Sequence, residues 1–314
     1  MENFRYVLEK YQQGGKNRFI CPACGLNKSF VRYIDIETGF YIDEFVGKCN
    51  RLEKCGYHFK PRDFFKQKGL KPEMFSSKIC KQNEKPTFYF DEDELLNSLH
   101  FKDKTSNLFD FLLKHFLEEK VSKTFKKYFV GVSERWSKSV IFWQVDRNQK
   151  VRAGKIMLYD SVTGKRDKFK FNWKEVKDDN FEMRQVFFGI HLIDYYKKYK
   201  IGIVESEKTA LLCDLFFDEE IVWIASGGLQ GLNEDKFKDL IGREVLLFPD
   251  LSSKKSKINA CELWKSKAEI ISKKIKIDIK INAILDKIAD KIDYENQEDL
   301  GDFIIKNLQS EKRK

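Results

Sequence analysis

The fold of the C-terminal part of this chain is decided by Ile-Gly-Ile-Val-Glu-Ser-Glu-Lys-Thr-Ala-Leu-Leu, residues 201–212. A short apolar strand ends there at a single carboxylate, Glu205, and a helix begins directly after it. A second apolar run, residues 245–248, ends in the same way at Asp250. Two carboxylates at the C-terminal ends of two strands lie where an open α/β sheet binds its ligands. Such oxygen ligands suit Mg²⁺, and Mg²⁺ suits phosphoryl transfer, so a nucleotide or nucleic-acid function is the leading hypothesis.

Strands and helices alternate from residue 199 onward. We predict strands at 199–204, 221–225, 243–248 and 274–281, and helices at 206–217, 233–240 and 258–273. This alternation predicts a mostly parallel sheet of four strands with helices on its faces. Isoleucine at every second position of the last strand favours a place at the edge of the sheet. A short helical tail around residues 302–305 follows it.

Four of the seven cysteines lie in the first 55 residues, in two pairs. Cys21 and Cys24 form one knuckle, and Cys49 and Cys55 form the other. Strands expected at 30–36 and 40–46, joined by residues 37–39, would bring the two knuckles together. This is the layout of a zinc ribbon, in which four thiolates hold one structural Zn²⁺.

One zinc ligand has an alternative in the sequence. Cys55 and His58 are also spaced as ligands, so His58 is a candidate in place of Cys49. We favour Cys49, because Gly56 directly after Cys55 matches the glycine that follows Cys24.

The composition fits a nucleic-acid partner without requiring one. The formal net charge is +10 and aromatic residues reach 14%; Lys and Arg neutralise phosphates, and rings stack on bases. A Lys-rich solvated surface explains the charge equally well. No apolar run approaches the roughly 20 residues that span a bilayer, and the N-terminus is not that of a signal peptide. The uneven cysteines indicate a reducing compartment, so we expect a cytoplasmic protein with no membrane partner.

The middle of the chain combines helices with a small antiparallel sheet. Residues 91–128 have helical spacing, with Ser106 as a cap, and strands are expected at 140–145 and 151–158. The chain is therefore predicted to be an α+β multidomain protein. We divide it into a zinc ribbon (1–68), a linker (69–90), a helical and antiparallel-sheet module (91–198), and an α/β domain with a C-terminal tail (199–314).

Three segments of the α/β domain resemble the toprim domain of bacterial primases, type IA topoisomerases and some nucleases. Val204-Glu205-Ser206-Glu207-Lys208-Thr209-Ala210 resembles its first motif, residues 225–232 resemble the glycine-rich turn after its second strand, and residues 248–252 stand where the family carries Asp-x-Asp. A zinc ribbon, a sheet-containing module and a toprim domain also follow one another in this order in bacterial primases.

The resemblance extends to most of the chain. Residues 142–146, 152–159 and 163–166 resemble an uncharacterised primase-like family of bacterial mobile elements and phages, which also has the N-terminal cysteine pairs. Because the activity of that family is not established, the resemblance implies the fold more firmly than the function.

The resemblance implies metal-assisted phosphoryl transfer. Asp250 would hold Mg²⁺ or Mn²⁺, and Glu205 would hold a metal or act as a general acid or base. Lys208 would meet a phosphate, and the amides at Gly227 and Gly228 would cradle another. Further phosphate or nucleic-acid contacts are predicted for Arg152, Lys155, Lys165 and Arg166 in the middle module, and for Arg32 and Arg51 in the ribbon.

One departure from the family pattern keeps several functions open. Ser252 replaces the second aspartate of Asp-x-Asp, which means weaker metal binding or a single metal, unless Asp299 and Asp302 fold back to compensate. The first hypothesis is a primase that uses nucleoside triphosphates on single-stranded DNA and works with a helicase or another replication protein. The second is a catalytically reduced DNA-binding accessory protein, and the third is a toprim nuclease. The sequence does not decide whether the chain is an enzyme.

Overall fold

The chain divides into two compact units, one formed by residues 1–84 and 255–258 and one by residues 85–254 and 259–314. The computed structural model describes residues 5–11, 17–36, 39–51, 53–69, 86–99, 105–176, 178, 180–217, 220–256 and 258–311. Most of the predicted linker, residues 70–85, lies outside the described residues. The predicted boundary at residue 198, within the second unit, stays a prediction.

The first unit is a small antiparallel sheet with the strand order β1-β2-β3-β4. Its elements are β1 (Tyr6–Leu8), β2 (Phe30–Asp35), β3 (Gly47–Cys49), β4 (His58–Phe59) and helix α1 (Pro61–Gln67). The predicted strand at 40–46 is wrong, because β2 pairs with β1 and β3. The segment joins β2 through an isolated bridge between Ile34 and Tyr41 and a few irregular backbone hydrogen bonds, without forming a strand. Two residues of the predicted turn, 37 and 38, lie outside the described residues.

The second unit begins with short helices and an antiparallel sheet in the order β5-β6-β7-β8. The elements are α2 (Glu92–Ser98), α3 (Asn107–Leu112), α4 (Glu118–Lys127), β5 (Val130–Ser133), β6 (Ser139–Val145), β7 (Val151–Tyr159), β8 (Arg166–Trp173) and a 3-10 turn, η2 (Ile190–Leu192). Ser106 caps α3 as predicted, because its side chain accepts a hydrogen bond from the amide of Phe109 at 3.3 Å.

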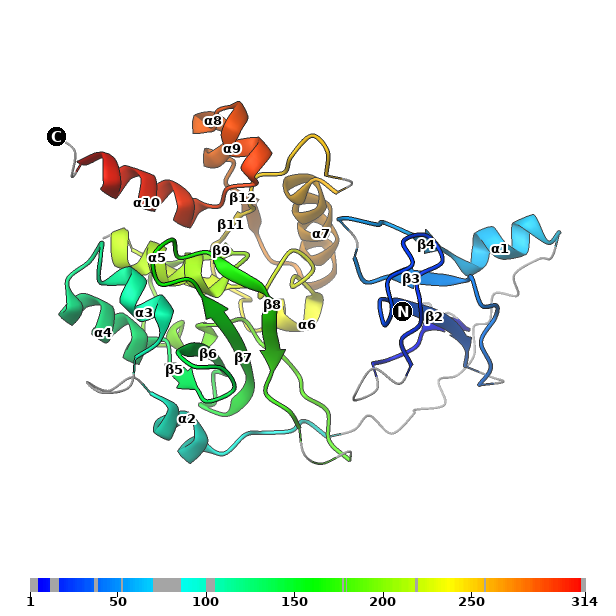
Figure 1. Ribbon diagram of the computed structural model, residues 1–314, viewed down its shortest axis with the longest axis horizontal. Coiled ribbons are helices and arrows are strands. Elements are labelled where there is room, and N and C mark those ends of the chain that lie inside the picture. The colour runs from blue at the N-terminus through cyan, green and yellow to red at the C-terminus, as the bar shows by residue number, and fades with distance from the viewer. Residues whose placement is uncertain are drawn as a thin grey trace. The chain divides into compact units, whose positions relative to one another are not determined.

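A parallel sheet of four strands follows, as the alternating pattern predicts (Figure 1). Its elements are β9 (Lys200–Val204), α5 (Glu207–Phe216), β10 (Ile221–Ala225), α6 (Glu234–Lys238), β11 (Val245–Phe248), α7 (Ala260–Ile275), β12 (Ile279–Ile281), α8 (Ile284–Ile288), α9 (Lys291–Asn296) and α10 (Leu300–Glu311). The strand order is β10-β9-β11-β12, so β12 lies at an edge as expected. The predicted strand at 274–281 starts too early: α7 continues to Ile275 and ends at Lys276, which has a positive φ of 55°.

The register brings three strand ends to one level. Val204 is the Cα partner of Ala225 on β10 and of Phe248 on β11. Crossover connections between parallel strands are right-handed, so the chain leaves β9 toward one face of the sheet and leaves β10 and β11 toward the other. The end of β9 is therefore a topological switch point, where open α/β sheets bind ligands.

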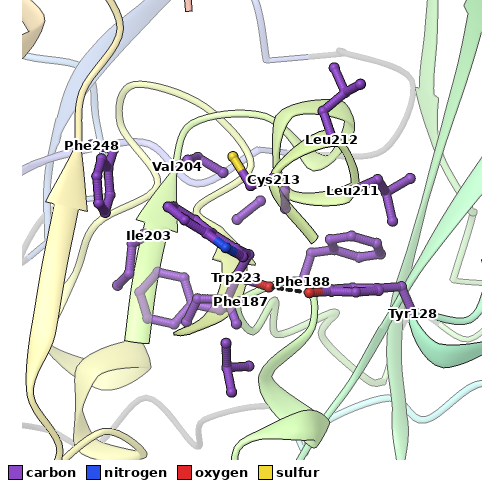
Figure 2. Close-up of a cluster of buried hydrophobic side chains, with 14 of the residues drawn as sticks. Tyr128, Phe187, Phe188, Ile203, Val204, Leu211, Leu212, Cys213, Trp223 and Phe248 are labelled. Carbon is purple, nitrogen blue, oxygen red and sulfur yellow. Dashed lines mark hydrogen bonds between the residues drawn. The ribbon is translucent and has the colours of Figure 1, made fainter. Parts of the chain in front are cut away.

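One hydrophobic core joins the two sheets of the second unit. Figure 2 shows Trp223 between Phe248 and Ile203 on one side and Phe188 and Tyr128 on the other. The hydroxyl of Tyr128, which is fully buried, donates to the carbonyl of Trp223 at 2.8 Å. The last residues of β9, β10 and β11 are part of this core. None of the helices in the described part of the chain combines the length and apolar character needed to cross a bilayer.

Candidate functional site

The first unit contains a four-cysteine cluster. The sulfur atoms of Cys21, Cys24, Cys49 and Cys55 all lie within 4.8 Å of one another, and those of Cys21 and Cys55 are 3.7 Å apart. Four thiolates at about 2.3 Å from a tetrahedral Zn²⁺ lie about 3.8 Å from each other. The cluster therefore fits a structural zinc.

Glycines turn the two knuckles toward the cluster. Gly25 and Gly56 have φ angles of 67° and 64°, which favour glycine over other residues. Their amides donate back to the carbonyls of Cys21 and Arg51 at 2.9 and 3.2 Å. The cluster contains Cys49 and not His58.

His58 has a different partner. Its Nε2 atom lies 2.8 Å from the hydroxyl of Tyr33, and the two rings stack. Burial and the nearby Lys48 and Lys60 lower the pKa of His58. The geometry thus assigns Cys49 to the cluster and His58 to the sheet beside it.

The second unit brings the two predicted acids together. Glu205 follows β9 and is 8% exposed, and Asp250 follows the neighbouring strand β11. The backbone amide of Asp250 donates to Oε1 of Glu205 at 3.4 Å. The two carboxylates therefore belong to one site at the switch point.

The C-terminal segment brings further acids to this site. The amide of Leu251 donates to the carbonyl of Glu298 at 3.0 Å, and the hydroxyl of Thr209 donates to Oδ2 of Asp299 at 2.8 Å. Asp299 and Asp302 exchange side-chain to backbone hydrogen bonds at the start of α10, at 2.9 and 3.2 Å. The expectation that Asp299 and Asp302 fold back toward Asp250 matches this arrangement.

The electrostatics of the site favour a cation. Burial and the negative charges of Glu205, Asp299 and Asp302 raise the pKa of the Asp250 carboxyl well above its ordinary value. Burial and the charge of Asp299 also raise the pKa of Asp302. Lys208 opposes both effects and lies 3.6 Å from Oδ1 of Asp302. A divalent cation would relieve this repulsion, and carboxylate oxygens are the ligands that Mg²⁺ takes.

The arrangement of the carboxylates near Asp250 suits a Mg²⁺ ion that takes one or two ligands from the protein. Among the residues that the structure describes, only the four cysteines form a group of three or more metal-ligating side chains within 4.8 Å of one another. Mg²⁺ is usually held by one or two carboxylates, with water or substrate phosphates in the other positions. Glu205 and Asp250 would be those two ligands.

Ser252 has a structural role at the position of the missing acid. Its hydroxyl accepts a hydrogen bond from the amide of Ala260 at 2.8 Å, at the start of α7. The side chain therefore anchors the loop that joins β11 to α7.

The glycine-rich turn after β10 lies beside Glu205. Gly227 and Gly228 have φ angles of 86° and 136°, which strain any other residue. The amide of Gly227 donates to the carbonyl of Glu205 at 3.1 Å, and that of Gly228 lies 3.4 Å from the hydroxyl of Ser226. The turn is therefore fixed against the end of β9.

The structure separates the four basic residues predicted to hold phosphates in the middle module. Arg152 pairs with Asp146 at 3.1 Å, and Lys155 is buried against Glu207. Lys165 and Arg166 are exposed near the other end of β7, where Arg166, the first residue of β8, is the strand partner of Tyr159. The phosphate contacts of these residues stay a prediction.

The two ribbon arginines lie apart in the first unit. The Arg32 guanidinium covers the ring of Phe19 at 3.9 Å, and its Nε donates to the carbonyl of Glu44 at 3.2 Å. Arg51 belongs to the second knuckle, where its carbonyl accepts from the amide of Cys55 at 2.8 Å. Their nucleic-acid contacts also stay a prediction.

Two residues at the site, Glu207 and Lys236, are not among those predicted from the sequence. Glu207 is fully buried in the first turn of α5, and Lys236 on α6 is 6% exposed. The only signal for Glu207 is a second acid directly after the strand, which is more often a helix-capping charge. No feature of the sequence around Lys236 indicates that this residue lies at the site.

Two sequence families match parts of the chain. Residues 106–251 match a family described as Domain of unknown function (DUF6371), and residues 4–70 match a zinc beta-ribbon finger family. A search of the curated proteins finds no match.

Solved structures similar to this chain include DNA primases. The zinc-binding and RNA polymerase domains of the Aquifex aeolicus primase are 15% identical, with a TM-score of 0.40 over 96% of this chain and 79% of that one. The primase fragment of the bacteriophage T7 primase-helicase protein is 11% identical, with a TM-score of 0.37 over 89% and 98%. A DNA primase domain from Pseudomonas aeruginosa is 13% identical, with a TM-score of 0.35 over 64% and 67%.

Proposed function

We propose that this chain is a primase-like nucleotidyltransferase that acts on single-stranded DNA with Mg²⁺ or Mn²⁺. Its substrates would be nucleoside triphosphates. It would act in the cytoplasm, in the replication of a mobile element, and its partner would be a helicase or another replication protein. The observation that carries the proposal is the meeting of Glu205, Asp250, Asp299 and Asp302 at the switch point of the parallel sheet.

The residues of the site have separate roles in this proposal. Asp250 and Glu205 would hold the metal, which when bound supplies charge stabilisation to a transferring phosphoryl group. Because burial and the neighbouring acids raise the pKa of Asp250, a metal would compete with a proton for this carboxyl. Lys208, held near Asp302, is placed to meet a phosphate oxygen. The turn at Gly227 would help to hold Glu205 in place, because its amide donates to the Glu205 carbonyl.

The zinc ribbon supports a DNA partner. Its described surface exposes Phe40 and Phe45, which are 75% and 49% exposed, and Arg32 lies over two rings in the same unit. Exposed rings and cations suit the stacking and phosphate contacts that single strands make.

A second function, a DNA-binding accessory protein with reduced catalysis, is favoured by Ser252. The hydroxyl of Ser252, which replaces the second acid, accepts a hydrogen bond from the amide of Ala260. The serine therefore has a structural role in the loop that does not involve a metal. In that case the acids would remain as a metal-binding surface without turnover.

A primer-synthesis assay on single-stranded DNA with labelled nucleotides and Mg²⁺ or Mn²⁺ tests the proposal. We expect product from the wild type and a loss of about 100-fold or more in Glu205→Gln and Asp250→Asn. Asp235→Asn is the matched control, because Asp235 is an exposed carboxylate on α6 that pairs with Lys238. No product from the wild type, with DNA binding intact in every variant, would favour the accessory protein, and cleaved DNA in place of product would indicate a nuclease.

A further inference from the structure

A buried ion pair joins the antiparallel sheet to the parallel one. Nζ of Lys155, on β7, lies 2.7 and 2.9 Å from the two carboxylate oxygens of Glu207, on α5. The Lys155 and Glu207 side chains are 7% and 1% exposed. A pair this deeply buried is costly to desolvate, and removal of one partner leaves an uncompensated charge in the core.

The same lysine also holds the glycine-rich turn. Nζ of Lys155 donates to the carbonyl of Gly227 at 3.1 Å. Nζ of Lys236, on α6, donates to the carbonyl of Ser226 at 3.1 Å and is attracted by Glu207. Two buried ammonium groups thus bind successive carbonyls of the turn, and the single charge of Glu207 offsets part of theirs.

The other side of the turn is hydrogen-bonded to the end of β9, next to Glu205. The amide of Ser226 donates to the carbonyl of Val204 at 3.0 Å, and that of Gly227 donates to the carbonyl of Glu205 at 3.1 Å. The turn is therefore clamped between the lysines and the end of β9. A change at Lys155 reaches Glu205 through one residue, Gly227, whose carbonyl accepts from Lys155 and whose amide donates to Glu205.

We infer that Lys155 is a positioning residue, which with Glu207 and Lys236 locks the glycine-rich turn against Glu205. The buried ammonium group already has three acceptor contacts, so it acts through Glu207 and the turn and does not hold a substrate phosphate itself. This replaces the phosphate contact that the sequence predicts for Lys155. The inference rests on the proposed function only where nucleotide affinity is concerned.

Hydrogen exchange of the turn amides tests the lock without any need for activity. In the full chain, Lys155→Met should speed the exchange of a peptide covering residues 225–232 by about tenfold or more. Lys165→Met is the matched control and should leave that peptide unchanged, because Lys165 is exposed. Lys155→Arg should restore most of the protection. Unchanged exchange in a folded Lys155→Met protein would overturn the inference.

Two further variants cover the case in which Lys155→Met fails to fold. The double variant Lys155→Met with Glu207→Met removes both charges of the ion pair, a change that is often neutral or stabilising for such pairs. It leaves Lys236, whose pKa is already lowered to about 8, so that this group can lose its proton. It should fold and still show fast exchange in the turn, because the bond to the carbonyl of Gly227 is gone. Full protection of the turn in this double variant would contradict the lock.

Nucleotide affinity distinguishes positioning from direct contact. Binding of a fluorescent ATP analogue is compared for Lys155→Met in the wild-type and Glu207→Gln backgrounds. Coupled residues give non-additive losses, so the effect of Lys155→Met should be much smaller when Glu207 is already changed. Equal losses in both backgrounds would indicate a direct phosphate contact and sink the inference. If the wild type binds no ATP analogue, the proposed function is in doubt while the exchange experiment still decides on the lock.

Discussion

Loss of one zinc ligand should unfold the first unit and leave the second intact. The apolar core of the first unit is small, since Phe30, Val31 and Val46 are its only buried large apolar side chains besides cysteine among the described residues. Burial of such side chains contributes about 1.5–3 kcal/mol each, or about 5–9 kcal/mol together. Zinc bound by a structural site contributes about 10–16 kcal/mol. The metal therefore contributes more than this core, which cannot replace it.

Cys49→Ser is the informative change, because Cys49 is fully buried within the cluster. We expect about one zinc per chain in the wild type and none in the variant by metal analysis. Limited trypsin digestion should remove the first unit of the variant and leave a resistant fragment from the second. Cys261→Ser is the matched control, since Cys261 is partly buried and lies outside the cluster.

His58→Ala separates the two ligand sets that the sequence leaves open. Because the His58 imidazole contacts Tyr33, this variant should keep its zinc. Zinc retained by Cys49→Ser, or zinc lost from His58→Ala, would refute the assignment of the cluster. A first unit that resists trypsin after zinc removal would refute the energetic argument.

Two predictions concern charge in the second unit. Asp250→Asn should stabilise the metal-free protein by about 1–2 kcal/mol and raise its Tm by about 2–8 °C, because a carboxyl whose folded pKa is raised destabilises the fold once the pH exceeds its unfolded value. The variant should also lose any rise in Tm on adding Mg²⁺; an unchanged Mg²⁺ response would place the metal elsewhere. Burial lowers the pKa of Lys236 to about 8 from an ordinary 10.5. Between these two pH values the unfolded chain binds a proton that the folded chain does not. The free energy of unfolding should therefore rise with pH in this range, by up to about 1.4 kcal/mol per pH unit. Denaturant unfolding of wild type and Lys236→Met should show a steeper rise in the wild type, and parallel curves would contradict the shift.

The parallel sheet was predictable because its signals are local. The strand at 221–225 has the predicted bounds, and the others differ mainly at their ends. The error in the start of the predicted strand at 274–281 has a physical origin. Ile275 lies four residues after Ile271, as in a helix, and two residues before Ile277, as in a strand. Burial of Trp264, Ala268 and Ile271 on one face decides for the helix.

The ribbon and the ion pair depended on contacts that a local reading does not contain. Residues 40–46 have strand-like composition, yet β2 pairs with Gly47–Cys49, so that Cys49 enters the cluster with Cys21. The partner of Lys155 is Glu207, on another sheet module, and no spacing rule joins them. A lysine near predicted phosphate-binding residues was therefore interpreted as one of them.

The place of Asp299 and Asp302 has a consequence for the order in which the protein matures on the ribosome. The four zinc cysteines precede residue 56, whereas Asp302 is synthesised about fifty residues after Asp250. At about 5–20 residues per second, translation separates Asp250 from Asp302 by about 3–10 s. A nascent chain can thus load its zinc early, but its carboxylate site stays open-sided until α10 emerges and docks on α5. The proposed chemistry is thereby withheld from a chain that is still being made.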